Sequence, residues 1–342
     1  MRLILYLLSL IYGIIVSLRN LLFDYNILKS KKHKIPIICI GNLSLGGSGK
    51  TPHTQYIAKL FSKTFNIAII SRGYGRKKKG FHYVELDSSA INIGDEPLLL
   101  KQDNSSCIVA VNKNRNKAVE KILNDYPQTN LILLDDGFQH RHIKKSINIL
   151  TTPFQKPFTK DNLIPLGRLR EHKKQALRAN IIIVSNSPRK INLIEKKEII
   201  QSFNLKKYQK LYFSSIKYCK FKCLKNNTDI KNEKDYIITL VTGIANPKNL
   251  LNYLEKTCRK VNFIRFSDHH NYTSKDIKNI LLQHNKEKSL KKLILTTEKD
   301  AVKLKSFLTH FKEENIYYIP IHIYIHNKDM FQKELLNYVK RN

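Results

Sequence analysis

The sequence predicts an α/β protein built on a mostly parallel β-sheet with helices on both faces. Short apolar runs alternate with segments of helical apolar spacing, which is the pattern of a parallel sheet. The runs expected to form its strands are residues 35–40, 67–70, 107–111, 131–134 and 181–184. A glycine-rich loop follows the first run, and a second, smaller set of alternating segments comes later. Because a domain typically holds ~150 residues, we expect about two domains in this chain of 342 residues.

The pattern divides the chain into three regions. Residues 1–30 are expected to form an N-terminal hydrophobic helix, and residues 31–212 carry the first alternating set. Near "KLYFSSIKYCKFKCL" the pattern becomes rich in strands, which is typical of a connector between lobes. Residues 213–342 are therefore expected to hold this connector and a smaller α/β lobe. The strands of that lobe are expected in "DYIITLVTG", "VNFIRF", "LILTT" and "IPIHIYI".

The N-terminal stretch "LILYLLSLIYGIIVSL" is apolar except for two serines and has an arginine on each side. It is shorter than the ~20 residues of a spanning helix, and the small residues of a signal-peptide cleavage site do not follow it. Two alternatives are a buried structural helix and a helix that lies in, or dips into, the membrane interface. In the second case the basic cluster at residues 29–34 would lie against lipid head groups. We expect membrane contact.

The glycine-rich loop, "GNLSLGGSGKTP", ends in Gly-Lys-Thr as a phosphate-binding P-loop does. The strict pattern G-x-x-x-x-G-K-[ST] has glycine at the place of Ser44. That glycine serves the turn out of the strand, and serine can occupy such a turn when its φ stays negative. A strand precedes the loop and a helical pattern follows it, which favours a nucleotide site over a simple glycine-rich turn. The expected fold is therefore P-loop NTPase-like.

The residues of this loop have distinct expected roles. Its backbone N–H groups would point toward phosphate oxygens at a helix N-terminus. Lys50 would reach the β- and γ-phosphates, and the Thr51 hydroxyl would ligate Mg²⁺. The residues expected to bind the nucleotide are Gly46, Gly47, Ser48, Gly49, Lys50 and Thr51.

A P-loop also needs an acidic residue at the end of a buried strand to position the metal. In "NLILLDDGFQHRHI" the apolar run 131–134 ends in Asp135 and Asp136. Two adjacent carboxylates destabilise each other unless a cation or hydrogen-bond donors offset their charge. An Asp-Asp-Gly turn is the alternative. We predict that Thr51, Asp135 and Asp136 hold Mg²⁺.

Two other stretches carry candidate acid–base residues. Asp95, in "INIGDEPLLL", lies just ahead of a helical run, where aspartate and a following proline also serve as a helix start. His269, in "RFSDHHNYTSKDIKNILL", follows the expected strand 261–266, where a histidine can pair with a carboxylate. A loop that leads into a capping-box helix explains this stretch equally well.

The composition is strongly basic, with 61 Lys+Arg against 27 Asp+Glu and a formal charge of +34. Nucleic acid, an anionic membrane surface or a phosphorylated substrate would all suit this charge, and so would a simple bias toward lysine. The lysines are scattered, and no motif with interleaved aromatics emerges, so we expect no nucleic-acid partner. The 5 cysteines lack zinc spacing, which is typical of a protein in a reducing compartment.

Eight stretches, in order along nearly the whole chain, are together highly specific. They are "GNLSLGGSGKTP", "SRGYGR", "GDEP", "DDGFQHRHI", "LIPLGRLRE", "TGIANP", "FSDHHNY" and "TEKDAVK". In this order they resemble the bacterial tetraacyldisaccharide 4′-kinase family, the lipid A kinases. That family also begins with a hydrophobic helix and has a residue other than glycine at the place of Ser44.

The resemblance implies an ATP-dependent kinase that phosphorylates the 4′-hydroxyl of a tetraacyl glucosamine disaccharide 1-phosphate, giving a bis-phosphorylated lipid A precursor. It implies that Asp95 pairs with His269 to activate the attacking hydroxyl, with Lys50 as the third catalytic residue. It also implies that Gln139 lies near the metal and the phosphates. The residues it suggests for phosphate or substrate contact are Arg72, Tyr74 and Arg170.

The resemblance also implies a location at the cytoplasmic face of the bacterial inner membrane, with peripheral or monotopic attachment. We expect a monomer whose two lobes close to assemble the site and exclude water. Two other classes of function stay open. One is a P-loop kinase of a soluble small molecule, and the other is a membrane-associated ATPase switch without an acceptor.

Overall fold

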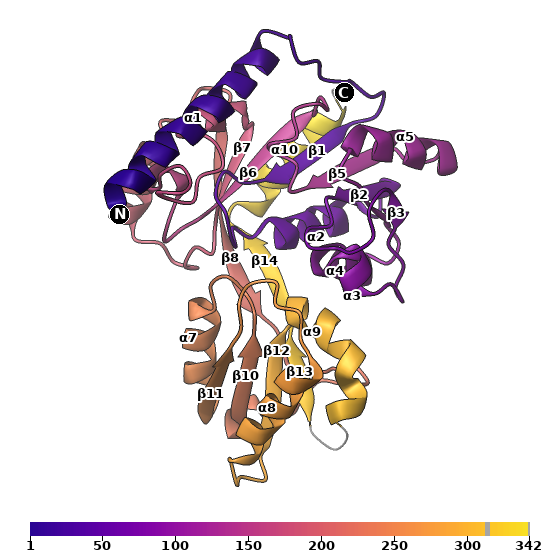
Figure 1. Ribbon diagram of the computed structural model, residues 1–342, viewed down its shortest axis with the longest axis vertical. Helices are drawn as coiled ribbons and strands as arrows, with labels where there is room; N and C mark the ends of the chain where they lie inside the picture. The colour runs from indigo at the N-terminus through magenta and orange to yellow at the C-terminus, as the bar shows by residue number, and fades with distance from the viewer. Residues whose placement is uncertain (312–314, 341–342) are drawn as a thin grey trace.

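The computed structural model describes residues 1–311 and 315–340 (Figure 1). Within these residues, a larger lobe surrounds a nine-stranded sheet, a smaller lobe surrounds a five-stranded sheet, and a long N-terminal helix lies against the larger lobe. Both sheets are mostly parallel and carry helices on both faces, so the expected fold class is confirmed.

The strand order of the larger sheet is β14-β8-β7-β6-β1-β5-β2-β4-β3. Its pairs are parallel except at the two edges, where β14 and β3 are antiparallel to their neighbours. The central strands are short apolar runs buried on both faces, as expected when helices cover both sides of a parallel sheet. The strands are β1 (Ile37–Gly41), β2 (Ile67–Ser71), β3 (His82–Tyr83), β4 (Ile108–Val111), β5 (Leu131–Asp135), β6 (Ile147–Pro153), β7 (Ile181–Ser185), β8 (Lys210–Tyr218) and β14 (Ile321–Ile325).

Alternate residues along β1 divide the core of the larger lobe into two layers. Ile38 and Ile40 face the layer that contains α2, α4 and α10, whereas Ile37 and Cys39 face the layer of α5. Further along the sheet, α6 packs over β6 and β7 through Ile199. The helices of this lobe are α2 (Lys50–Phe61), α3 (Ala90–Ile93), α4 (Asp95–Asp103), α5 (Arg115–Asp125), α6 (Leu193–Ser202) and α10 (Lys328–Lys340).

The smaller lobe has the strand order β11-β10-β12-β13-β9, with β9 antiparallel to β13 and the other pairs parallel. Helices α8 and α9 pack on one face of this sheet, and α7 packs on the other. Its strands are β9 (Lys222–Cys223), β10 (Ile237–Thr242), β11 (Lys260–Arg265), β12 (Lys292–Thr297) and β13 (Ile316–Ile319). Its helices are α7 (Lys248–Thr257), α8 (Ser274–Asn285) and α9 (Glu298–Leu304).

The strand pairing differs from the division expected at residue 212. Strand β8 runs through that point as part of the larger sheet, and β14 with α10 returns to the larger lobe instead of completing the smaller one. The cause lies at Pro320, which separates β13 from β14. Proline has no N–H to donate to a sheet ladder, so the apolar run breaks there and its second half pairs with β8.

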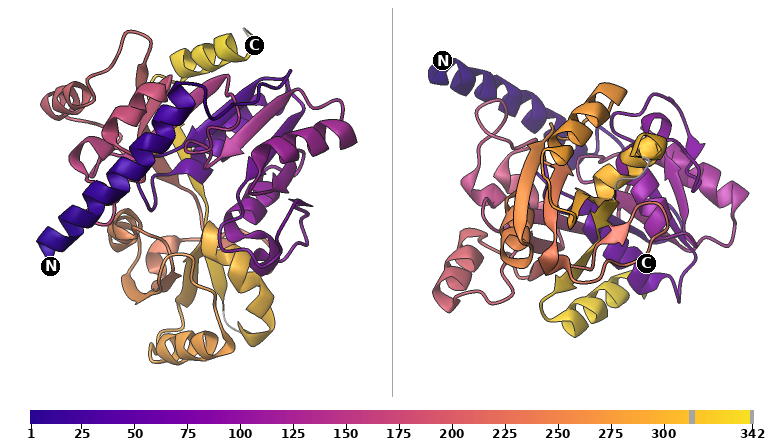
Figure 2. Two further views of the ribbon diagram at one scale, coloured as in Figure 1. Left: turned by 45° about the horizontal axis from the view of Figure 1, so that its top comes forward. Right: turned by 90° about the horizontal axis from the view of Figure 1, so that it is seen from below.

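Helix α1 (Arg2–Asp24) docks on the larger lobe mainly through polar contacts. The Ser9 hydroxyl donates to the Leu163 carbonyl at 3.1 Å, the Tyr12 hydroxyl to the Arg170 carbonyl at 2.7 Å, and the Asn20 amide to the Glu171 carboxylate at 3.0 Å. The N-terminal end of α1 projects past the rest of the lobe (Figure 2). Among the described residues α1 is the helix long and apolar enough to cross a membrane, and 11% of its most hydropathic window is buried.

Candidate active site

The glycine-rich loop connects β1 to α2, and glycine is required where its backbone is left-handed. Gly46 has a φ of 90°, and Gly49, which precedes the first residue of α2, has a φ of 82°. Ser44 is not among the described residues with positive φ, which agrees with the expectation that serine is tolerated there. Its backbone forms an antiparallel bridge with Leu169. The loop therefore has the backbone shape that phosphate binding at a helix N-terminus needs.

Buried polar side chains hold this loop in place. The Asn42 amide donates to the Ser44 carbonyl at 2.6 Å and to the Ser48 hydroxyl at 2.8 Å. The Ser48 hydroxyl also lies 3.0 Å from that of Thr151 on β6, and the Ser185 hydroxyl on β7 donates to the Ser48 carbonyl at 2.8 Å. Ser48 thus anchors the loop to two neighbouring strands, to β6 through its hydroxyl and to β7 through its carbonyl.

The two aspartates at the end of β5 have different surroundings. Asp135 is fully buried and its Oδ1 accepts from the Thr54 hydroxyl at 2.9 Å, whereas its Oδ2 has no hydrogen-bond partner within the described residues. Burial and the charges of Glu96 and Asp136 raise the pKa of Asp135 to about 7. A buried carboxylate oxygen without a partner favours either a proton or a cation.

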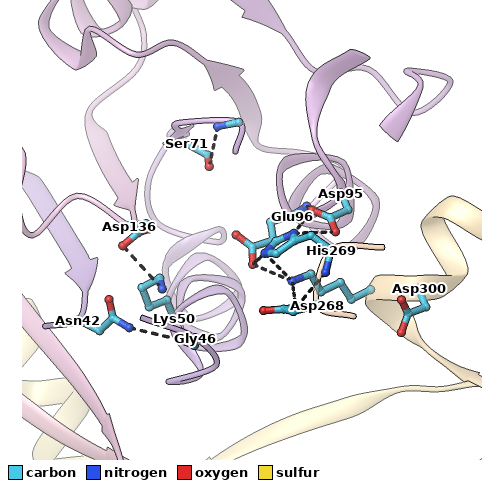
Figure 3. A network of polar contacts seen from close by, with 12 residues as sticks. Asn42, Gly46, Lys50, Ser71, Asp95, Glu96, Asp136, Asp268, His269 and Asp300 are labelled. Atoms are coloured by element: carbon cyan, nitrogen blue, oxygen red, sulfur yellow. Dashed lines mark hydrogen bonds and ion pairs between the residues drawn. The ribbon is translucent and has the colours of Figure 1, made fainter. Parts of the chain in front are cut away.

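Asp136 is held by cations instead. Its carboxylate oxygens both lie 3.1 Å from Arg170 Nη1. Its Oδ1 also lies 3.7 Å from Lys50 Nζ (Figure 3). Burial disfavours its ionisation, but Lys50 and Arg170 outweigh this effect and lower the pKa of Asp136. Arg170 therefore contacts the acidic strand end, and it also lines the cavity between the lobes.

The two candidate acid–base residues meet across the lobes. Asp95 is the first residue of α4, and His269 lies in the loop after β11 with a left-handed φ of 58°. His269 Nδ1 lies 3.1 Å and 3.3 Å from the two carboxylate oxygens of Asp95 (Figure 3). Burial disfavours a charge on Asp95, but the hydrogen bond from His269 and the charges of Lys299 and Lys303 hold its pKa well below the usual range. The hydrogen bond to Asp95 raises the pKa of His269, against the effects of burial and Lys299.

A cavity of about 390 Å³ between the lobes brings the loop and His269 together. Asp95 and Asp135 lie buried and do not line it. The expected site residues that do line it are Gly46, Gly47, Ser48, Gly49, Lys50, Thr51, Tyr74, Asp136, Arg170 and His269.

The remaining expected residues lie around this cavity in different ways. The Tyr74 ring is 5.3 Å from the His269 ring, so it flanks the acid–base pair. Gln139 donates to the Asn42 carbonyl at 2.8 Å and to the Glu171 carboxylate at 3.2 Å, so its amide supports the start of the loop and does not line the cavity. Arg72 is exposed in the segment after β2 and is also absent from the lining.

Sequence reasoning missed three side chains at the site. Thr54, and not Thr51, donates to Asp135. Lys299 and Lys303 of α9 surround Asp95 and His269, with Lys299 Nζ 3.1 Å from His269 Nε2 and Lys303 Nζ 3.4 Å from Asp95 Oδ2. The signal for the lysines was the "TEKDAVK" stretch, which the resemblance included but to which no role was given.

The chain is similar to one family of known proteins along its whole length. A family model described as "Tetraacyldisaccharide-1-P 4′-kinase" matches residues 1–340. A "Tetraacyldisaccharide 4′-kinase" of Bacteroides fragilis is 40% identical, covering 98% of this chain and 92% of that protein. One of Phocaeicola vulgatus is 39% identical, covering 99% and 95%. The crystal structure of LpxK from Aquifex aeolicus in complex with ATP has a TM-score of 0.75 at 26% identity, covering 99% of both chains.

Proposed function

Since the chain belongs to the tetraacyldisaccharide-1-P 4′-kinase family, we propose that it transfers the γ-phosphoryl group of ATP to the 4′-hydroxyl of a tetraacyl glucosamine disaccharide 1-phosphate. The product is the bis-phosphorylated lipid A precursor. One observation carries the proposal: a P-loop from the larger lobe and a histidine–carboxylate pair shared by both lobes meet at one cavity. This arrangement supports a phosphoryl donor site next to a group that can accept a hydroxyl proton.

Both lobes contribute residues to the proposed reaction. The sugar 4′-oxygen attacks the γ-phosphorus, the bond from that phosphorus to the β–γ bridging oxygen breaks, and ADP leaves. The loop N–H groups and Lys50 offset the charge on the transferring group. Asp95 accepts the hydroxyl proton, and His269, which donates to it through Nδ1, orients its carboxylate. Tyr74 and Arg170 contact the acceptor or the phosphates. Arg72, in the exposed segment after β2, also contacts the phosphates or the acceptor.

The residues present fit a bound Mg²⁺. The unpartnered Oδ2 of Asp135 is a hard oxygen ligand, and Thr51 lies in the first turn of α2, the helix whose Thr54 hydroxyl donates to Asp135 Oδ1. Among residues 1–311 and 315–340 no group of three or more His, Cys, Asp or Glu side chains forms a metal site, so phosphate oxygens would complete the shell. We assign the ion to Thr51, Asp135 and Asp136. When bound, it would neutralise charge on the β- and γ-phosphates.

Binding of Mg²⁺ is expected to release a proton from Asp135. Its pKa of about 7 means that the carboxyl carries a proton in much of the protein near neutral pH and below. A metal needs the carboxylate, so Mg²⁺ titrated into the complex with a non-hydrolysable ATP analogue should displace this proton at about pH 6 and not at about pH 8.5. Calorimetry in buffers of different ionisation enthalpy measures the release. Asp135→Asn supplies the baseline, and equal proton release by this variant would contradict the assignment.

We also propose that the exposed side of α1 binds the protein to the cytoplasmic face of the inner membrane. We propose that the protein acts there as a monomer and has no nucleic-acid partner. Isoleucines along this side are more than half exposed, at 56% for Ile11 and 62% for Ile15. A helix whose apolar side faces away from the protein lies naturally in the lipid interface. An acceptor with acyl chains would be held in that same layer.

The double variant Ile11→Glu/Ile15→Glu should bind lipid vesicles far more weakly than the native protein. Burying one isoleucine is worth ~1.5–3 kcal/mol, so the pair is expected to reduce partitioning by at least ~100-fold. Co-sedimentation with vesicles that contain anionic lipid measures the effect. Leu282→Glu on α8, a residue that is 69% exposed, is the matched control and should bind as the native protein does. Unchanged binding by the double variant would exclude this side of α1 as the membrane contact.

The direct test of the function is transfer of label from γ-labelled ATP to a tetraacyl disaccharide 1-phosphate in detergent micelles. Labelled product is expected with this acceptor and not with soluble sugars. Label on a soluble acceptor alone would favour a small-molecule kinase. Slow ATP hydrolysis that no acceptor accelerates would favour an ATPase switch and overturn the proposal.

A further inference from the structure

Two lysines of α9 contact the candidate acid–base pair from the smaller lobe. Lys299 and Lys303 are four residues apart, so they lie on one side of the helix. That side faces α4, whose first two residues are Asp95 and Glu96. Lys299 Nζ lies 3.3 Å from Glu96 Oε1, and Lys303 Nζ lies 3.4 Å from Asp95 Oδ2. Each acidic residue at the start of α4 thus has its own lysine from the other lobe.

Lys299 determines which nitrogen of His269 carries the proton. Its Nζ lies 3.1 Å from His269 Nε2, and an ammonium group can only donate. Nε2 must therefore accept, which leaves the ring proton of the neutral imidazole on Nδ1. Nδ1 is the atom that lies 3.1 Å from Asp95 Oδ2. Lys299 thus selects the tautomer that donates to Asp95.

Lys303 is buried between two carboxylates. Its side chain is 7% exposed, and its Nζ lies 3.5 Å from Asp300 Oδ1 as well as 3.4 Å from Asp95. Asp300 is fully buried and accepts from the Thr242 hydroxyl at 2.6 Å, from the Gly243 N–H at 3.0 Å and from the Thr297 hydroxyl at 2.8 Å. These bonds fix Asp300 to the ends of β10 and β12, so Lys303 is anchored to the smaller lobe and directed at the larger one.

The charges around Asp95 come from both lobes. Carboxylates outnumber the ammonium groups here, so removing one lysine leaves excess negative charge beside the proposed proton acceptor. The groups that face this cluster are Glu96 of α4, Asp268 and His269 of the loop after β11, the Tyr272 ring, and Lys299, Asp300 and Lys303 of α9.

We propose that Lys303 and Lys299 are positioning residues for phosphoryl transfer, through which the smaller lobe keeps Asp95 ionised and His269 in its donating tautomer. The inference rests on the proposed role of Asp95. It explains why Lys303 is buried, and Lys299 partly buried, at a site where an apolar pair would cost less desolvation. It also means that the proton acceptor is complete only when α9 lies against α4.

The decisive variant is Lys303→Met, which keeps the length of the side chain and removes its charge. An opposite charge at this distance typically lowers a carboxyl pKa by ~1–3 units, so its loss should move the acidic limb of the kcat profile up by that amount. Because the native pKa of Asp95 lies well below the ordinary value of 3.8, the shifted limb falls below about pH 5, so the ratio of native to variant kcat should be largest at the lowest pH at which both proteins stay folded and should level off above about pH 5, with little change in KM for ATP. NMR titration of labelled Asp95 should show the same upward shift without any need for turnover.

Three further variants distinguish the effect of the lysine charge from an effect on packing or stability. Lys303→Arg keeps the charge and should restore the acidic limb toward its native position. Thr242→Val removes a hydrogen bond to Asp300 without changing any charge, so it should lower the thermal midpoint without moving the limb. Lys299→Met changes a side chain that is 18% exposed. It should move the acidic limb of the kcat profile in the same direction as Lys303→Met, and it replaces that variant in the test if Lys303→Met does not fold.

A kcat ratio that stays constant with pH, together with an unchanged Asp95 titration, would overturn the inference even if the native protein transfers phosphate. A shift in Thr242→Val as large as in Lys303→Met would also overturn it, because the lysine would then act only through packing. If the native protein transfers no phosphate, the proposed function fails, and the Asp95 titration still decides the role of the lysines.

Discussion

Asp95→Asn is expected to lower kcat by ~10²–10⁴-fold, the range for loss of a positioned proton acceptor. Asparagine has nearly the same shape but cannot accept the hydroxyl proton, and its neutral amide cannot offset Lys303. Because Asp95 is buried beneath the cavity and does not line it, ATP affinity should stay near the native value. Steady-state kinetics with the lipid acceptor, combined with titration of a fluorescent ATP analogue, separates the two quantities.

The same loop offers a matched control. His270 Nε2 lies 3.1 Å from Asp276 Oδ2, which is a second histidine–carboxylate pair with similar geometry, outside the cavity. Asp276 also caps α8, so Asp276→Asn should cost some stability. Its kcat should stay close to native. A loss of less than ~10-fold in Asp95→Asn, below the usual contribution of proton transfer, would remove Asp95 from the reaction.

Lys50→Ala is expected to lower phosphoryl transfer by ~10²–10³-fold, the usual cost of removing one preorganised charge-stabilising donor. Lys50 is the first residue of α2 and its Nζ lies 3.7 Å from Asp136, so its charge is already held next to the glycine-rich loop. The loss should fall mainly on kcat if Lys50 acts on the transferring group, and ATP should also bind more weakly. Single-turnover transfer and ATP titration measure the two effects.

Lys59→Ala, in the last turn of the same helix, is the control for Lys50→Ala. Lys59 is exposed. The Lys59→Ala variant should therefore have native kinetics. If Lys50→Ala retained native kcat while losing only affinity, Lys50 would contribute to binding ATP and not to the chemical step.

The central part of the fold was predictable because burial on both faces leaves apolar runs in the sequence. Strands β1, β2, β4, β5 and β7 lie where such runs occur, with boundaries that differ by one or two residues. Strand β6 was not predicted. It carries Thr151, which is buried because its hydroxyl contacts Ser48 and donates to the Gly41 carbonyl at 3.2 Å. Its apolar residues Ile147, Ile149 and Leu150 are interrupted by a half-buried asparagine and followed by two threonines, so no unbroken apolar run marks this strand.

The candidate site was predictable where one segment forms it and unpredictable where two lobes form it. The loop from Gly46 to Thr51 and the acidic end of β5 are local motifs, so spacing alone identified them. The pairing of Asp95 with His269 came from the resemblance, since their approach to 3.1 Å depends on how the lobes pack. Lys299 and Lys303 were given no role for the same reason, because they contact Glu96 and Asp95 only when α9 lies against α4.

Pro320 has a further consequence for the architecture. The chain leaves the larger lobe after β8 and re-enters it at β14, and at the crossing the Cys219 N–H donates to the Pro320 carbonyl at 2.9 Å. The smaller lobe is therefore a domain inserted into an edge hairpin of its host, with entry and exit side by side. A short turn in place of residues 220–319 would reconnect the host sheet without stretching it. Such a protein would keep the phosphate loop and Asp95 and lose His269, Lys299 and Lys303, so the residues of the proposed site are divided between the host and the inserted domain.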